Sequence, residues 1–304
     1  MKTPPTISVI MSIYNQFNRE YLQDAIMSVL GQTFTDFEFI IYNDGSDESV
    51  CLHLETYAKM DPRIVVINNP KNHGLAYSLN TCIDVAKGKY LARMDDDDIC
   101  EPNRFQVQVD YLNAHPEIAF VGCNAKLIDK NGVWGHRTMP ENPTKNSFLR
   151  FSPYIHPTVM IRRNIFDKQA AYRSSKETWR CEDYELFMRL AQLGYRGHNI
   201  QEELFCYRED NVSYKKRKLK YRIDEMRLRY RNFQSMGILY PLGWPYVIRP
   251  LVAGIIPSPV ILGAKKCYHL IGRIRGKRVG EEITTIQTNT EERLDMEQSL
   301  RKII

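Results

Sequence analysis

Short apolar runs alternate along the first part of the chain with stretches whose apolar residues recur at helical spacing. The run ISVIMSI at residues 7–13 predicts a buried strand, and the apolar spacing over residues 21–30 predicts a helix that ends near Gly31. The alternation then repeats, with further strands expected at 37–42, 64–67 and 90–94 and further helices at 50–60 and 75–86. Apolar strands covered by helices on both faces predict an α/β fold with a doubly wound, mostly parallel sheet. Ligands of such sheets bind beyond the carboxyl ends of the strands.

The pattern changes after residue 101. A helix is expected at 104–114 and strands around 118–127, followed by mixed segments that extend the sheet. Near residue 213 the composition shifts to a basic, helix-forming stretch that runs to about residue 234. We therefore expect an α/β domain over residues 1–212 and a helical, partly apolar extension over residues 213–304.

A hydrophobic stretch at residues 240–264 precedes a basic one. Its prolines and Arg249 leave fewer than the roughly 20 uninterrupted apolar residues that a spanning helix needs. Residues 265–278 then carry six Lys and Arg residues and no acid. An apolar segment joined to bases suits a helix that lies on anionic lipid. An apolar C-terminal subdomain or a dimer surface, with the bases solvated, fits the pattern equally well.

Composition narrows the possible partners and compartments. A chain of 304 residues with 43% hydrophobic and 26% charged residues is typical of a soluble globular protein. The net charge of +6 is too small to imply nucleic acid, and no aromatic platform for RNA is present. The seven cysteines are scattered without a CxxC pair, which is typical of reduced thiols. With no signal peptide in the N-terminal pattern, we expect a cytoplasmic protein, with peripheral contact to the cytoplasmic face of a membrane as a further option.

The acidic run Asp95 to Asp98 directly follows the strand expected at 90–94. Four adjacent carboxylates repel one another, so a buried strand end tolerates them best when a cation or solvent absorbs their charge. Asp95 and Asp97 can converge on one Mn²⁺ or Mg²⁺, leaving positions for diphosphate oxygens and water. An acidic run is more often a solvated loop, but its place at the end of a buried strand favours a metal site.

Asp44 ends the second expected strand, in the sequence YNDGS. Its carboxylate can accept hydrogen bonds from a ribose or a base, while Gly45 allows a tight turn and close approach of a ligand. The alternative is that this is turn chemistry, with Asp44 capping the next helix.

Glu182 and Asp183 open an apolar-periodic helix that ends at Gly194. A carboxylate at a helix N-terminus is ordinarily a cap that the helix dipole stabilises. It can also serve as the general base that deprotonates an acceptor hydroxyl. We place Asp183 ahead of Glu182 in that role.

Taken together, the chain resembles the inverting glycosyltransferases of family 2, which have the GT-A fold. The resemblance covers roughly residues 6–212 and rests on segments that are weak singly and specific in this order: ISVIMSIYN, QTFTDFEFIIYNDGSDE, NHGLAYSLNTCIDVAKGKYLARMDDDDICEPNRF, HPEIAFVGCNAKLIDKNG, HPTVMIRR, EDYELFMRLAQLGYR and FCYR. No Gln-x-x-Arg-Trp segment follows the base, and no spanning helix is expected. Both are features of processive polymer synthases, so the resemblance implies a non-processive member of the bacterial polysaccharide type.

The resemblance assigns roles to individual residues. Asp97, helped by Asp95, would hold the metal, and Asp183, with Glu182 beside it, would supply the catalytic base. Ser12, Tyr14 and Asp44 would contact the nucleoside. The full set of donor-binding residues that it implies is Ser12, Tyr14, Asp44, Asn72, Gly74, Arg93, Asp95 and Asp96.

Two positions depart from the family pattern. Asn43 replaces the first of the two aspartates that commonly precede Gly-Ser, and Asp96 stands where many relatives have a small residue. The second departure could alter which carboxylates reach the metal. Alternative interpretations make Asn72 and Gly74 a loop and Arg93 a surface residue.

The expected reaction is the inverting transfer of a single sugar from a nucleoside diphosphate donor, most simply a UDP-sugar, to a hydroxyl of a saccharide or lipid-linked saccharide. Surface polysaccharide or glycolipid synthesis would use such an enzyme. A nucleotidyltransferase acting on a sugar phosphate is one alternative, although it would show a Gly-rich basic loop after the first strand. A non-catalytic, membrane-associated scaffold is the other. His156 could line an acceptor pocket, but a lone His beside Pro is more often structural.

Overall fold

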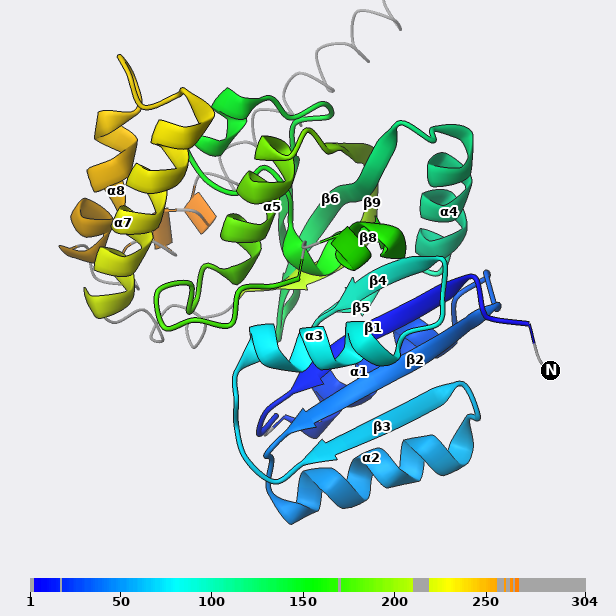
Figure 1. Ribbon diagram of the computed structural model, residues 1–304. Helices are drawn as coiled ribbons and strands as arrows, with labels where there is room; N and C mark the ends of the chain where they lie inside the picture. The colour runs from blue at the N-terminus through cyan, green and yellow to red at the C-terminus, as the bar shows by residue number, and fades with distance from the viewer. Residues whose placement is uncertain are drawn as a thin grey trace, which may run out of the picture. The chain divides into compact units, whose positions relative to one another are not determined.

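The computed structural model describes residues 3–16, 18–168, 171–209, 219–255, 260, 263–264 and 266–267 (Figure 1). The chain divides into two compact units, residues 1–256 and residues 257–304. The helices and strands given below all belong to the first unit. The domain boundary expected at residue 213 and the bases at 215–218 lie outside the described residues, whereas Lys220 and Arg222 lie within them.

One nine-stranded sheet runs through the described part of the chain. The strand order is β3-β2-β1-β4-β8-β6-β9-β5, and β7 pairs with β6 off this path. The strands are β1 (Ile7–Ile13), β2 (Phe37–Asp44), β3 (Ile64–Asn69), β4 (Tyr90–Met94), β5 (Ile99–Cys100), β6 (Ile118–Asp129), β7 (Gly132–Arg137), β8 (Met160–Arg162) and β9 (Arg196–Arg208).

The sheet has a parallel half and a mixed half. β3, β2, β1 and β4 are all parallel, as the strand and helix alternation predicts. β8 then runs antiparallel to both β4 and β6, whereas β6 and β9 are parallel to each other. β7 follows β6 after a tight turn in which Gly132 has a φ of +100°, a value that favours glycine. Helical crossovers join β1 to β2, β2 to β3 and β3 to β4. Of the antiparallel pairs, β6 and β7 are joined by a short turn, whereas β4–β8, β6–β8 and β5–β9 bring together strands that are distant in the sequence.

Helices cover both faces of this sheet and divide the core in two. Val9 and Met11 of β1 belong to the apolar cluster beneath α1, α2 and α4, whereas Ile10 belongs to the cluster beneath α3 and α5. Figure 1 shows α3 in front of the sheet and α1 behind it. Burying each large apolar side chain contributes about 1.5–3 kcal/mol, so this alternation fixes which side of every strand faces which helix. The helices are α1 (Arg19–Leu30), α2 (Glu48–Met60), α3 (Leu75–Val85), α4 (Arg104–Ala114), α5 (Glu182–Gln192), α7 (Leu219–Met236) and α8 (Trp244–Ile255), with 3-10 turns η1 (Lys145–Phe148), η2 (His156–Thr158) and η3 (Arg163–Lys168).

The last two described helices, α7 and α8, pack against each other, and α7 also contacts α5. α8 covers part of the hydrophobic stretch that the sequence places at 240–264, and Pro250 lies inside it. Across the described residues, no helix combines the length and the apolarity that crossing a bilayer requires.

Candidate active site

The carboxyl ends of β2, β1 and β4 lie side by side at one edge of the sheet. The register pairs Met11 of β1 with Met94 of β4, so Ser12 is level with Asp95. Asp44 ends the strand on the other side of β1. Since neighbouring strands are about 4.8 Å apart, the donor-site candidates of all three strands share one edge.

Asp44 is almost completely buried, with 1% of its surface exposed. Its Oδ1 accepts a hydrogen bond from the backbone N–H of His73 at 2.9 Å, and its Oδ2 accepts one from Gly74 at 2.8 Å. Asp44 therefore does not cap α2, whose N-cap is Asp47. The carboxylate instead holds the segment that leads into α3, and its oxygens retain lone pairs for a ligand.

The turn after β2 touches this segment directly. Gly45 has a φ of +79°, and a Cβ added to it would lie 2.7 Å from the backbone nitrogen of Asn72. Asn72 is exposed, and Gly74 is the N-cap of α3 with a φ of +89°. The structure thus brings Asp44, Asn72 and Gly74 together, and only glycine fits at position 45.

Two hydrogen bonds join the loop after β1 to the loop after β2. The backbone N–H of Asn15 donates to Ser46 Oγ at 3.0 Å, and the Asn15 side chain accepts from the backbone N–H of Asp47 at 2.9 Å. Asn15 has a φ of +47°, a left-handed conformation that asparagine tolerates better than most residues. Tyr14, directly before it, keeps its side chain exposed at this edge.

Arg93 lies in β4 with only 3% of its surface exposed, so the alternative that makes it a surface residue is wrong. Its Nη2 forms an ion pair with Asp95 Oδ1 at 2.5 Å. Burial disfavours the guanidinium charge, but the neighbouring carboxylates outweigh burial and raise the pKa of Arg93. Nε and Nη1 have no hydrogen-bond partner. Buried donors without partners are rare in folded proteins, and at an open sheet edge they point to a ligand.

The acidic run is partly buried rather than a solvated loop. Burial raises the pKa of Asp96 to about 8, and the charges of Asp97 and Asp95 add to the increase. Asp98 is 1% exposed, and burial together with the same neighbours raises its pKa well above the usual range. Its Oδ1 accepts the backbone N–H of Arg208 at 2.7 Å, whereas its Oδ2 has no partner. The fold holds these carboxyls where their joint ionisation is unfavourable unless a cation is present.

β9 positions this run from the other side. The Nε of Arg208 donates to the backbone oxygen of Asp97 at 2.7 Å, and its guanidinium lies 3.6 Å from the ring centroid of Tyr21. Gln16, in the loop after β1, hydrogen bonds to the Asp96 carboxylate and so opposes the rise in its pKa. The acidic run is therefore held by both halves of the sheet.

The chemistry of these side chains suits a hard divalent cation. Carboxylate oxygens are the ligands that Mn²⁺ and Mg²⁺ prefer, and Mg²⁺ usually keeps waters and substrate phosphates in its coordination sphere. No group of three or more His, Cys, Asp or Glu side chains is arranged to hold a metal ion in the part of the chain that the structure describes. The carboxylates of Asp95 and Asp97 are ligands of the type that such a cation binds.

Asp183 and Glu182 form the first turn of α5. Glu182 is buried, and burial raises its pKa. Arg180, just before this helix, adopts a φ of +71°, which is unusual for a residue with a side chain. Such a conformation persists only where the surrounding structure enforces it, so the entry of the chain into α5 is closely defined.

Tyr172 lies between α5, which carries Asp183, and the acidic run. Its hydroxyl lies 2.7 Å from His156 Nε2 in a buried pair. Burial raises the pKa of Tyr172; Arg93 opposes that rise, and the carboxylates of Asp183 and Asp95 add to it. Both carboxylates therefore lie within electrostatic reach of one hydroxyl. The predicted base and the predicted metal-binding run are thus both near Tyr172.

His156 lies inside this cluster and is uncharged. Burial, followed by the nearby Arg93, lowers the pKa of His156 well below its usual range. The side-chain amide of Asn80 in α3 fixes the Tyr172 segment: its Nδ2 donates to the Tyr172 backbone oxygen at 2.8 Å, and its Oδ1 accepts from the Tyr172 backbone N–H at 2.9 Å. Trp179, later in that segment, approaches Gly74, since a Cβ added there would lie 3.9 Å from the indole. The segment before α5 thus reaches both the donor-site loop and the acidic run.

Sequence patterns do not identify Tyr172, Gln16 or Trp179 as parts of the site. Tyr172 and Trp179 belong to a stretch without helical or strand periodicity, and Gln16 lies in a loop. Arg208 could have been found, because it ends the FCYR segment on which the family resemblance rests in part.

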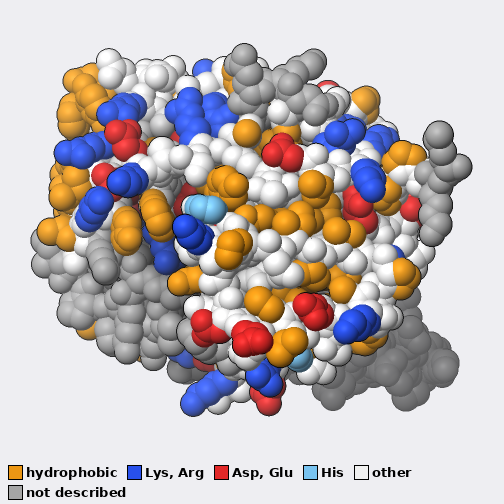
Figure 2. All heavy atoms as spheres, turned by 60° about the horizontal axis from the view of Figure 1, so that its bottom comes forward, with side chains coloured by type: hydrophobic (Ala, Val, Ile, Leu, Met, Phe, Trp, Pro, Cys, Tyr) orange, Lys and Arg blue, Asp and Glu red, His pale blue; other side chains and the backbone are white. Residues whose placement is uncertain are grey.

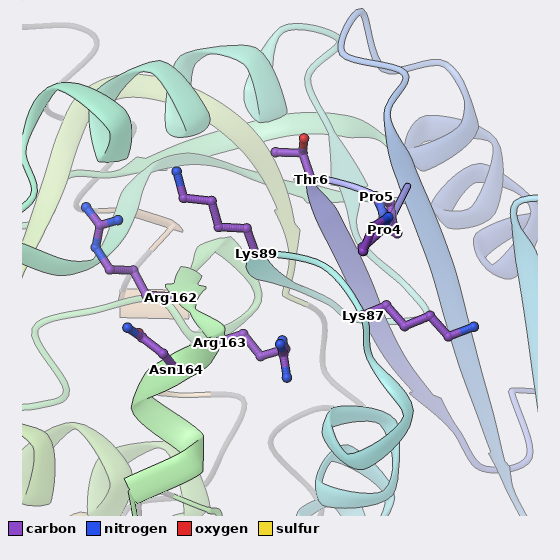
Figure 3. Close-up of a pocket in the computed structure, with 8 residues that line it drawn as sticks. All are labelled: Pro4, Pro5, Thr6, Lys87, Lys89, Arg162, Arg163 and Asn164. Atoms are coloured by element: carbon purple, nitrogen blue, oxygen red, sulfur yellow. The ribbon is translucent and has the colours of Figure 1, made fainter. Parts of the chain in front are cut away.

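A cavity of about 460 Å³ opens at the opposite, amino-end edge of the sheet (Figure 3). Although several cations line it, the arginines serve the protein itself. Arg162 donates to the backbone oxygens of Leu112, His115 and Ile118, at and just beyond the C-terminus of α4, and Arg163 donates to that of Gly88. Cations stabilise the negative end of a helix, so these residues have a structural explanation. The lining residues are Pro4, Pro5, Thr6, Lys87, Lys89, Arg162, Arg163 and Asn164.

Sequence relatives agree with the family that the motifs suggest. Residues 8–179 match glycosyl transferase family 2. The chain is 35% identical over 263 residues to EpsE of Bacillus subtilis (strain 168), covering 86% of this chain and 93% of that protein. It is 32% identical over 220 residues to the O-antigen biosynthesis glycosyltransferase WbnJ of Escherichia coli, covering 71% and 84% of the two chains. The chain therefore belongs to glycosyl transferase family 2 and is a glycosyltransferase.

Solved structures agree on the fold. Residues 1–349 of S. aureus TarS in complex with UDP-GlcNAc give a TM-score of 0.61 at 17% identity, covering 77% of this chain and 71% of that one. The mannosyltransferase PcManGT from Pyrobaculum calidifontis, in complex with GDP-Man and Mn²⁺, gives 0.60 at 13% identity, covering 88% and 81%. These likenesses confirm the expected GT-A fold. The relatives give no support to a nucleotidyltransferase or to a non-catalytic scaffold.

Proposed function

We propose that the protein transfers a single sugar, with inversion, from a nucleoside diphosphate donor to a hydroxyl of a saccharide or lipid-linked saccharide in surface polysaccharide synthesis. One observation carries this proposal. Tyr172 lies within electrostatic reach of both Asp183 and Asp95, which supports a candidate base and a candidate metal-binding run at one site. The O-antigen role in the name of WbnJ supports the polysaccharide assignment, and the UDP-GlcNAc bound to TarS supports a UDP-sugar donor.

The donor would lie along the shared carboxyl-end edge. Ser12, Tyr14 and Asp44 receive the nucleoside, with Asn72 and Gly74 beside it. Arg93 directs its two unpartnered donors, Nε and Nη1, toward oxygens of the diphosphate or the sugar. An exposed aromatic ring such as Tyr14 provides a face on which a base can stack.

The residues proposed to hold Mn²⁺ or Mg²⁺ are Asp97 and Asp95, with Asp96 next to them. A metal bound there would stabilise the negative charge that develops on the departing nucleoside diphosphate. Arg93 keeps the Asp95 carboxylate oriented through their ion pair. Arg208 holds the backbone at Asp97, which fixes where the run points. The Mn²⁺ bound to PcManGT supports this choice of cation.

Asp183 is the proposed general base. It takes the proton of the acceptor hydroxyl while that oxygen attacks the anomeric carbon from the side opposite the diphosphate. The new carbon–oxygen bond to the acceptor forms as the bond to the diphosphate breaks, which inverts the anomeric centre. No covalent sugar–enzyme intermediate is required. Glu182, buried next to Asp183, keeps a proton more readily than an exposed glutamate because its pKa is raised.

Two substitutions test these roles separately. Asp183→Asn should lower transfer about 1,000-fold or more, because general base catalysis contributes roughly 10²–10⁴-fold, while donor binding stays within about 3-fold. Asp97→Ala should also abolish transfer, and it alone should weaken Mn²⁺-dependent binding of the nucleotide. Release of nucleoside diphosphate and calorimetric titration of the donor give the two readouts. Asp84→Asn, at an exposed position of α3, is the control. Near-normal turnover by Asp183→Asn would refute the base assignment.

We also propose that the protein acts in the cytoplasm, with peripheral contact to the cytoplasmic face of a membrane. None of its seven cysteines, all of which the structure describes, forms a disulfide. Free, mostly buried thiols are typical of a reducing compartment. A lipid-linked acceptor would also bring the enzyme to a membrane surface.

A further inference from the structure

α8 packs with one side and leaves the other side uncovered. Val247 is buried, as are Gly243 and Pro250. On the opposite side, Trp244, Ile248 and Val252 follow one another at intervals of one helical turn and are all exposed. The helix that carries the hydrophobic stretch is thus anchored to the fold and still presents an apolar face.

This face continues into the turn before α8. We call the whole surface the α8 patch, which consists of five large apolar residues with exposed fractions from 41% to 71%: Tyr240, Leu242, Trp244, Ile248 and Val252. Arg249 is the only charged residue of α8, and the helix contains no acid. The exposed side of a surface helix is ordinarily polar, so a contiguous apolar surface of this kind indicates a binding partner.

We propose that the α8 patch docks on an anionic lipid surface. Trp and Tyr are favoured where apolar and polar phases meet, and aliphatic side chains beside them bury in the acyl boundary. This inference deepens the proposed function, because a lipid-linked acceptor would be presented at the same surface.

The helix that packs against α8 is basic and complements such a surface. α7 carries five Lys and Arg residues against two acids. Arg227 and Arg231 of α7 are well exposed, although each has an acidic partner, Asp224 and Glu177. In the sequence, six further Lys and Arg residues follow at 265–278 with no acid among them. Figure 2 shows hydrophobic side chains at the left edge of the molecule, interspersed with Lys and Arg and with fewer Asp and Glu side chains. The basic excess of α7 would repel the same helix of a second copy, whereas anionic lipid would attract it.

Vesicle binding tests the proposal without donor, metal or acceptor. The full chain should sediment with vesicles of phosphatidylcholine that contain 30% phosphatidylglycerol and bind much less to pure phosphatidylcholine. Ile248→Glu combined with Val252→Glu should lower partitioning about 10-fold or more, because two apolar side chains no longer enter the acyl boundary. Leu52→Glu, which also charges an exposed apolar position on a helix, should leave it unchanged. Brominated lipid should quench Trp fluorescence in the wild type and not in Trp244→Phe.

Several results would overturn the proposal. The first is equal vesicle binding by the double variant and the wild type. The second is a mass in analytical ultracentrifugation that doubles for the wild type and not for the double variant, since the patch would then join two copies. The third is neither vesicle binding nor self-association, which would mean that the chain covers the patch itself. Transfer to a water-soluble acceptor should be the same in the double variant, so a failure here is distinct from a failure of the proposed function.

Discussion

A buried or half-buried arginine lies at each end of the parallel strands, and the two differ in how many of their hydrogen-bond donors have partners. At the amino-end edge, Arg162 donates to three backbone oxygens, so its guanidinium is fully used by the fold. At the carboxyl-end edge, Arg93 pairs with Asp95 and leaves two buried nitrogens without a hydrogen-bond partner, and Asp98 leaves one buried oxygen. A cavity opens at the first edge, but the uncompensated groups lie at the second. Buried groups without a hydrogen-bond partner thus occur at the edge where we propose that the donor binds, although His53 Nε2 of α2 and Asn199 Oδ1 of β9 are further examples outside it.

Positive φ values at residues other than glycine also occur near the carboxyl-end edge. Two non-glycine residues of the described chain have positive φ, Asn15 and Arg180. Asn15 follows the carboxyl end of β1, and Arg180 precedes the helix that carries Asp183. Conformations of this kind cost about 1–3 kcal/mol and are retained mainly where function requires them.

The largest difference between the two edges should appear when the arginine at each edge is replaced by methionine. Arg93→Met should lower kcat/KM about 100- to 1,000-fold, because a preorganised charge near the departing diphosphate is lost and Asp95 loses its partner. Arg162→Met should instead lower the free energy of unfolding by about 1–3 kcal/mol, because the hydrogen bonds to three backbone carbonyls are lost. Its kcat/KM per folded molecule should stay within about 3-fold. Steady-state kinetics and denaturant unfolding measure the two quantities, and equal losses of activity would remove the distinction.

A pair of buried tyrosines gives a smaller and more selective effect. Tyr172→Phe should lower kcat about 10-fold, because His156 loses its partner and the cluster between Asp183 and Asp95 loses its fixed geometry. The donor KM should change little. Tyr90→Phe is the matched control at the amino-end edge, where the hydroxyl bonds to Asn113 at 2.7 Å. It should alter stability and leave kcat unchanged. A loss of kcat in both variants would mean that Tyr172 acts only through packing.

Much of the fold and part of the site follow from the sequence because they depend on local periodicity. The strands that place Asp44 and the acidic run at one edge are predicted from short apolar runs, and α4 has the bounds expected for it. Tyr172 could not be predicted, since its place depends on hydrogen bonds to Asn80, 92 residues earlier. The burial of Arg93 could not be predicted either, because the sequence of a short strand does not show which neighbouring strands will cover a charged residue in it. Contacts across distant segments, rather than local preference, decide both cases.

A substitution at Asp98 should show how much the buried acidic run lowers the free energy of unfolding. The pKa of Asp98 is raised in the folded protein, so its stabilising contribution is complete below the unfolded pKa of about 3.9 and is lost as the pH rises toward the folded value. In metal-free buffer with EDTA, Asp98→Asn should therefore gain about 1–2 kcal/mol over the wild type at pH 7.5 and nothing near pH 4. Denaturant unfolding across this range measures the difference, with Asp84→Asn as the exposed control. A gain independent of pH would show that ionisation is not the cause.

The smallest effect is expected at the lysines of the amino-end cavity. Lys87 and Lys89 line it, and Lys89 already bonds to Asn113 Oδ1 at 2.8 Å. Because parallel α/β sheets bind ligands beyond the carboxyl ends of their strands, Lys87→Ala combined with Lys89→Ala should leave kcat/KM for donor and acceptor within about 2-fold. Kinetics at low ionic strength would reveal any contribution of these charges to steering a diphosphate, since screening is then weakest. A 10-fold loss there would mean that both edges bind substrate, and that hydrogen-bond satisfaction does not separate a structural cation from a functional one in this fold.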